Sequence, residues 1–226
     1  GPAHNSNQPT LTFGGRGIAT CSITTYGSKL PQHSGHYGNY VSNPVFSLSR
    51  LLTSMKSDDG KVLIKDYYKG ININKVVSNI LNSVPDSTID INNSLLIHKA
   101  ESVGENYQEA LQYPTLNVRQ IGPSWKGEGL KTIIPEYATA NIDVRLVVET
   151  DGELQLEKIK KHIKNQGFLV LDRVPTDKER LENFKIVTFK GNSGLNAFRT
   201  PLNSPFGEKL RISLTSIFGK KPASIR

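Results

Sequence analysis

Apolar and polar residues alternate without interruption between residues 137 and 148. One side of this run carries Ala138, Ala140, Ile142, Val144, Leu146 and Val148, and the other side carries Tyr137, Thr139, Asn141, Asp143 and Arg145. A period of two is typical of a strand with one buried face, so we predict a strand of an antiparallel sheet with Arg145 on its polar side. Residues 17–26 are rich in β-branched side chains and partly alternate, which predicts a second strand.

Two other segments have the spacing of amphipathic helices. The first begins at Asn43-Pro44, a side-chain cap followed by proline at the first helical position, and ends at Asp58-Asp59-Gly60. The second begins at a capping-box pattern over residues 150–153 and ends at Gly167. The apolar positions are Val45, Leu48, Leu51, Leu52 and Met55 in the first helix, and Leu156, Ile159 and Ile163 in the second.

Further strands are predicted over residues 115–121, 168–171 and 184–189. Two helices packed on one face of a sheet bury these apolar stripes economically. We therefore predict an α+β domain over residues 1–190, with a four-stranded antiparallel, ferredoxin-like sheet and two helices on one face. An insertion of about residues 61–113 follows the first helix, with one helix expected to end near Pro85 and another expected between Ala100 and Leu111.

The last residues, 191–226, differ in character. Ser204-Pro205 begins a helix that Gly219 ends. Its apolar positions are Phe206, Leu210, Leu214, Ile217 and Phe218. Because the sheet domain is complete without this helix, we expect the surface that covers its apolar side to be missing from this chain.

The amino-acid composition says less about function than the pattern of apolar and polar residues says about the fold. A single cysteine, Cys21, cannot form an internal disulfide and fits a reducing, cytoplasmic location. No apolar run reaches the roughly 18 residues of a membrane span. The net charge of +8 leaves nucleic acid open as a partner. The densest basic cluster, residues 158–164, is interpreted as the solvated face of a helix.

Two polar side chains, His33 and Arg145, lie in segments whose backbone conformation the sequence indicates clearly. His33 precedes Gly35 and Gly38, where the backbone can bend freely. The guanidinium of Arg145 has the shape that binds a carboxylate. Together they point to a small anionic substrate whose carbonyl and carboxylate are both held. Taken singly, His33 also fits a hydrogen-bonded loop residue and Arg145 a surface ion pair. No cluster has the spacing of a structural zinc site.

Residues 10 to about 190 resemble the lid, or dimerisation, domain of the zinc exopeptidase family. This family includes carnosinase-type dipeptidases, aminoacylase, acetylornithine deacetylase and succinyl-diaminopimelate desuccinylase. The matching elements are residues 12–17, His33-Ser34-Gly35 with Gly38, Asn43-Pro44, Asp59-Gly60, Gly127 to Gly129, residues 131–135 and Arg145-Leu146. The elements around His33 and residues 131–135 are most similar to the dipeptidase branch.

The resemblance implies a role within a larger enzyme. The parent enzyme would use a pair of zinc ions to hydrolyse a small peptide or N-acyl amino acid. Its metal ligands would lie outside this chain, which alone would bind no zinc and be inactive. The lid would form a homodimer and supply two side chains to the partner's active site: His33 to stabilise the carbonyl and oxyanion, and Arg145 to bind the terminal carboxylate. Thr132 would lie near the same groups. Residues 191–226 would return to the catalytic domain.

Three alternatives stay open at this stage. The carnosinase branch has a histidine aligned near Asn192-Ser193 that is absent here, so both dipeptidase and deacylase activities fit. A basic module that binds RNA on its sheet is a second alternative, which needs exposed aromatic side chains on the sheet face; Tyr137 is the main candidate. A pure oligomerisation module without substrate contact is the third.

Overall fold

The two strands predicted from alternation pair with each other along their whole length in the computed structural model of the chain. β3 (Gly17–Tyr26) and β7 (Tyr137–Leu146) run antiparallel, with Gly17 opposite Leu146 and Tyr26 opposite Tyr137. The structure describes residues 4, 6–124 and 131–225. The element Gly127 to Gly129 that contributes to the family resemblance therefore lies outside the described residues.

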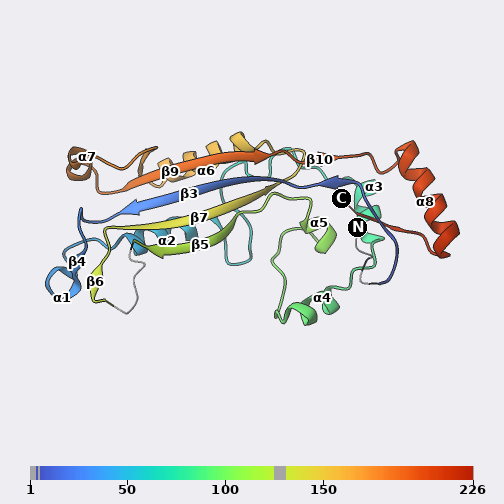
Figure 1. Ribbon diagram of the computed structural model, residues 1–226, viewed down its shortest axis with the longest axis horizontal. Helices are drawn as coiled ribbons and strands as arrows, with labels where there is room; N and C mark the ends of the chain where they lie inside the picture. The colour runs from blue at the N-terminus through green and yellow to red at the C-terminus, as the bar shows by residue number, and fades with distance from the viewer. Residues whose placement is uncertain (1–3, 5, 125–130, 226) are drawn as a thin grey trace.

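β3 and β7 form the centre of a five-stranded sheet with the order β5-β7-β3-β9-β8 (Figure 1). β5 (Asn117–Pro123) and β9 (Ile186–Leu195) are antiparallel to their neighbours, whereas β8 (Leu169–Leu171) is parallel to β9. The sheet is thus mixed, which corrects the expected four-stranded antiparallel, ferredoxin-like sheet. The segment that joins β8 to β9 contains the short helix α7 (Asp177–Glu182). It is long enough for the chain to return to the end of the sheet where β8 began, so that β9 can run parallel to β8. β9 also runs past the boundary expected at residue 190.

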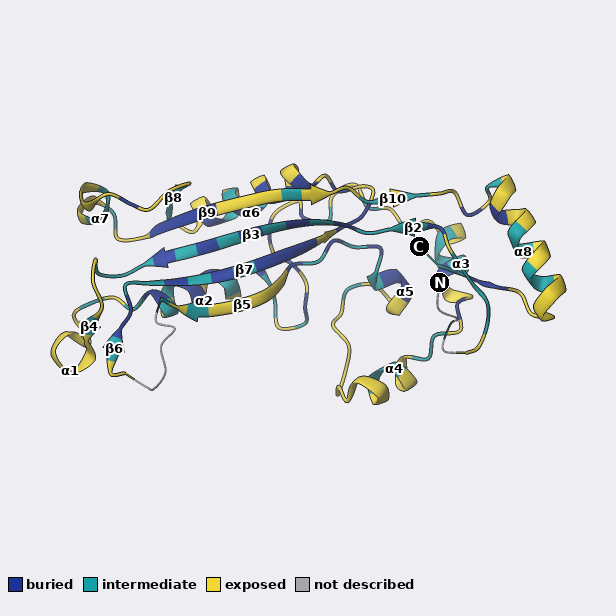
Figure 2. Cartoon of the chain, in the orientation of Figure 1, coloured by how far each residue is buried: buried dark blue, intermediate teal, exposed yellow. Residues whose placement is uncertain are grey.

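Helices α2 (Pro44–Met55) and α6 (Gly152–Asn165) pack on one face of this sheet, as the sequence predicts (Figures 1 and 2). The side chains that form this core are Ala19, Cys21, Ile23, Leu48, Leu51, Met55, Ala138, Ala140, Ile142, Val144, Ile159 and Ile163. Burial raises the pKa of the Cys21 thiol to about 12. The opposite face of the sheet, which carries the alternate residues of β3 and β7, is left for polar side chains.

The two core helices begin with side-chain caps. The Asn43 side chain accepts a hydrogen bond from the Val45 amide at 2.9 Å. In α6 the cap is Asp151, whose carboxylate accepts from the Leu154 amide at 2.9 Å. The capping box expected to begin at Thr150 is therefore wrong by one residue. The Thr150 hydroxyl instead donates to the Val147 carbonyl and closes the turn after β7.

His162 joins the two core helices and predicts a pH dependence of stability. Its Nε2 lies 2.9 Å from the Ser54 hydroxyl of α2, and burial lowers the pKa of His162 below its usual value of 6.5. The unfolded chain therefore binds the proton more readily, so we expect the free energy of unfolding to fall as the pH drops from 7.5 through 6.5 to 5. Urea midpoints across this range measure the slope. A His162→Gln variant should flatten it and an exposed His98→Gln variant should not; equal slopes in both contradict the assignment.

The segment between α2 and β5 joins the main core through its first part, where Val62, Ile64 and Tyr67 are buried. It contains α3 (Lys75–Asn82), which ends before Pro85 as predicted, and α4 (Thr88–Leu95). Of the helix expected between Ala100 and Leu111, only α5 (Tyr107–Ala110) forms. The segment is fastened at Tyr67, which is 1% exposed and whose hydroxyl donates to the Thr115 carbonyl at 2.8 Å.

The two ends of the described chain meet beyond the start of β3. β1 (Thr10–Thr12) pairs in parallel with β11 (Ala223–Ile225), and β2 (Gly14–Gly15) pairs with β10 (Phe198–Arg199) (Figure 1). α8 (Pro205–Phe218) protrudes from this end, and its side chains Phe206, Ile212, Ile217 and Phe218 are exposed (Figure 2). None of the helices in the described part of the chain is long and apolar enough to cross a membrane.

Candidate functional site

His33 lies in a tight turn at one end of the sheet. It ends β4 (Gln32–His33) and caps the single-turn helix α1 (Ser34–Tyr37), because its Nδ1 accepts a hydrogen bond from the Gly35 amide at 3.0 Å. A Cβ at position 35 would lie 2.8 Å from the His33 ring, so glycine permits this contact. With Nδ1 acting as the acceptor, the hydrogen of the neutral ring is assigned to Nε2, which can donate to a ligand.

The structure brings Thr132 to the same turn. The Ser34 amide and hydroxyl both donate to the Thr132 carbonyl, at 2.9 Å and 3.1 Å. β6 (Ile133–Ile134) then pairs with β4, with Ile133 opposite His33. His33 and Thr132 are both exposed. His33 and Thr132 are thus neighbours in space at one exposed turn, although they are about a hundred residues apart in sequence.

Arg145 stands on the polar face of β7 near its last residue. Its side chain is 51% exposed, and its Nε lies 3.9 Å from the Asp143 carboxylate, which is 10% exposed. The same carboxylate accepts a hydrogen bond from Asn117 at 2.9 Å and lies 3.9 Å from the Nε of Arg119. The Asp143 carboxylate therefore helps to position the Arg145 side chain. Sequence reasoning missed this role, although the two residues share one strand face at a spacing of two.

The structure does not bring Arg145 to His33. Arg145 is eight residues along β7 from Tyr137, which corresponds to about 25 Å at the rise of a strand. His33 and Thr132 lie beyond the Tyr137 end, beside β6, whereas Arg145 lies at the end where the chain termini meet (Figure 1). A dipeptide spans only about 7 Å. The His33 and Arg145 side chains of one chain are therefore too far apart to hold the two ends of one dipeptide.

The described residues contain no group of three or more His, Cys, Asp or Glu side chains that could hold a metal ion. The His33 and His36 rings lie close together, with ring centroids 4.8 Å apart. The candidate groups are thus an exposed imidazole at one end of the sheet and a half-exposed guanidinium at the other.

Comparison with known proteins identifies the family. A model described as a peptidase dimerisation domain, of the M20 peptidases, matches residues 13–168, well over half of the chain. The chain belongs to the M20 peptidase dimerisation domain family. The dug1 Cys-Gly metallodipeptidase of Schizosaccharomyces pombe is 27% identical over 168 residues, which cover 70% of this chain and 34% of that protein. The Beta-Ala-His dipeptidase of Mus musculus is 24% identical over 173 residues, covering 70% of this chain and 33% of that protein.

Solved structures of M20 peptidases have the same fold. The family metallo-carboxypeptidase Sso-CP2 of Sulfolobus solfataricus superposes with a TM-score of 0.78 at 21% identity, over 100% of this chain and 48% of that one. Human carnosine dipeptidase 1 superposes with a TM-score of 0.75 at 19% identity, over 97% and 45%. The dimerisation domain described here spans about a third of the length of the relatives it matches in sequence.

Proposed function

We propose that this M20 domain is the dimerisation domain and lid of a metal-dependent dipeptidase, and that it completes active sites across a homodimer. His33 and Thr132 of one chain bind the scissile carbonyl in the partner's site. Arg145 binds the substrate's terminal carboxylate in the site of its own chain. The observation that carries this proposal is the placement of the two groups at opposite ends of one sheet, too far apart to share a small substrate.

The chemistry of each group supports its assigned role. The Nε2–H of His33 is a neutral donor on an exposed turn, suited to a carbonyl oxygen that becomes negatively charged during attack. Arg145 keeps both terminal nitrogens clear of ion pairs with the residues that the structure describes, so the planar fork can take a carboxylate. The pairing of β1 with β11 lies beyond the start of β3, at the same end of the sheet as Arg145.

The parent enzyme is proposed to carry a metal pair, with zinc as the expected metal. The names of the metallodipeptidase relatives support metal dependence. A bound metal pair would supply an activated water for attack on the amide. The role proposed for this domain is to bind and orient the substrate. Dipeptides are the favoured substrates because several relatives are named dipeptidases; N-acyl amino acids remain the second substrate class.

RNA binding is less well supported. The aromatic side chains on the polar face of the described sheet are Tyr26 and Tyr137, which lie together at one end with ring centroids 6.4 Å apart. The Tyr26 hydroxyl is hydrogen-bonded to Thr188 at 2.8 Å, and Arg180 covers its ring at 4.9 Å. This leaves little aromatic surface for stacking bases.

A mixed dimer tests the proposal. The whole enzyme is produced with His33→Ala in one chain and Arg145→Ala in the other, under two different tags, and the mixed dimer is purified. One of its two sites then has an intact His33 and an intact Arg145, so we expect about half of the wild-type activity. Each variant paired with itself should be nearly inactive.

The outcome distinguishes the arrangements. If both side chains of one chain served the same site, neither site of the mixed dimer would be intact and activity would not return. Failure of the two chains to co-purify contradicts the homodimer itself. A mixed dimer of His33→Ala with wild type is the matched control and should also keep about half of the activity.

A further inference from the structure

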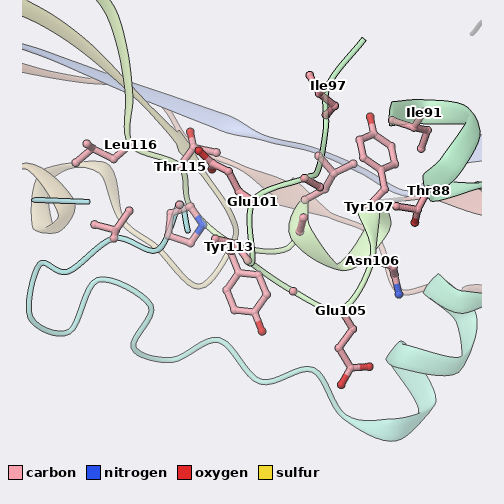
Figure 3. A pocket seen from close by; sticks show the side chains of 18 of the residues that line it. Thr88, Ile91, Ile97, Glu101, Glu105, Asn106, Tyr107, Tyr113, Thr115 and Leu116 are labelled. Carbon is pink, nitrogen blue, oxygen red and sulfur yellow. The ribbon is translucent and has the colours of Figure 1, made fainter. Parts of the chain in front are cut away.

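A pocket of about 400 Å³ lies between the α4–α5 segment, the residues that follow α2 and the residues that precede β5. Small-molecule sites occupy roughly 300–1,000 Å³, so its size fits a small ligand. Figure 3 shows Ile91 and Tyr107, from α4 and α5, on one side of the hollow, and Leu116, from the segment before β5, on the other. Further apolar lining comes from Leu95, Ile97, Val103 and Leu111.

Arg16 places a positive charge beside the apolar lining of this pocket. Its Nη2 donates to the Tyr113 carbonyl at 2.5 Å, while its Nε is buried and has no hydrogen-bond partner among the described residues. No carboxylate in the described part of the chain forms an ion pair with it. Burial, and then the charge of Arg145, lower the pKa of Arg16 from its usual value. A partly buried cation without a counter-ion is costly, and an anion relieves that cost.

The carboxylates of the pocket are engaged elsewhere or directed outward. Glu101 forms an ion pair with Lys56 at 2.7 Å. The Glu105 side chain is exposed and extends away from the apolar lining in Figure 3. The pocket thus combines an apolar wall with one uncompensated guanidinium.

We propose that this pocket binds a small amphipathic carboxylate, with its apolar body against α4, α5 and Leu116 and its carboxylate on Arg16. Arg16 is the cation of the described lining that has no ion pair, whereas Lys56 is paired with Glu101. None of the residues that line this pocket belongs to the turn of His33, and its ligand binding can be measured without catalysis.

Calorimetric titration of the chain with octanoate, 1-octanol and octylamine tests the proposal. We expect octanoate to bind about tenfold or more tightly than the alcohol, and octylamine to bind weakest, because a hydrogen-bonded charge pair is worth at least that factor. In Arg16→Gln the affinity for octanoate should fall about tenfold, while that for octanol stays within about twofold.

A second variant covers the case in which Arg16→Gln fails to fold, which circular dichroism detects. Ala110→Phe fills the pocket from α5 and leaves Arg16 in place, so it should abolish binding of octanoate and octanol alike. Equal affinity for octanoate and octanol in the wild-type chain overturns the proposal. So does undiminished octanoate binding by a folded Arg16→Gln or Ala110→Phe variant, or the absence of octanoate binding up to its solubility limit.

Discussion

Replacing His33 with alanine in the whole enzyme is expected to lower kcat by roughly 10²–10³-fold and to change KM by no more than about threefold. The loss falls on kcat because the oxygen that His33 binds gains negative charge only as the amide is attacked. A donor aimed at that oxygen therefore stabilises the transition state more than the bound substrate. Steady-state kinetics with a dipeptide measure both constants.

Two variants separate this chemical role from a structural one. His33→Asn keeps an acceptor for the Gly35 amide, and asparagine is a good helix cap, so the turn should survive while the Nε2 donor is lost. It should be nearly as inactive as His33→Ala. His36→Ala removes the neighbouring ring, 4.8 Å away, and should keep most of the activity. Full activity in His33→Asn would show that the residue only shapes the turn.

Much of the fold could be predicted because burial imposes a period on each element. β3 has the bounds that its β-branched run predicts, and α2 begins at the predicted Asn43 cap. The pairing direction of the fifth strand, β8, could not be predicted, because alternation over three residues does not show whether a strand is parallel or antiparallel to its neighbour. Its parallel pairing is decided by how the chain returns through α7, which is a tertiary effect.

In the candidate site, too, some features could be predicted from the sequence and others depend on tertiary structure. The chemical identity of His33, Thr132 and Arg145 is visible in the sequence, but their separation depends on the register of β3 with β7. Once Tyr26 pairs with Tyr137, the loop after β3 must lie at the far end from Arg145. Arg16 is different: its lack of a counter-ion is a property of the packed α4–α5 segment, and no spacing in the sequence reports it.

Replacing Arg145 with alanine is expected to raise KM for dipeptides by about 10- to 150-fold with a smaller change in kcat. Each hydrogen bond to a charged group contributes about 1.5–3 kcal/mol, and the carboxylate is bound in both the ground state and the transition state. Arg145→Lys should recover only part of the affinity, because an ammonium group cannot present two parallel donors.

The substrate itself supplies the decisive control for this last variant. A dipeptide with a C-terminal amide has no carboxylate, so the wild-type enzyme should bind it as weakly as Arg145→Ala binds the free acid, and the substitution should add little further loss. If Arg145→Ala weakened acid and amide equally, its effect would be structural, through the buried Asp143 that it partly neutralises. An Asp143→Asn variant, which keeps an acceptor but removes the charge, should then show the same loss. Under our proposal its loss is smaller, because the fork of Arg145 remains available to the carboxylate.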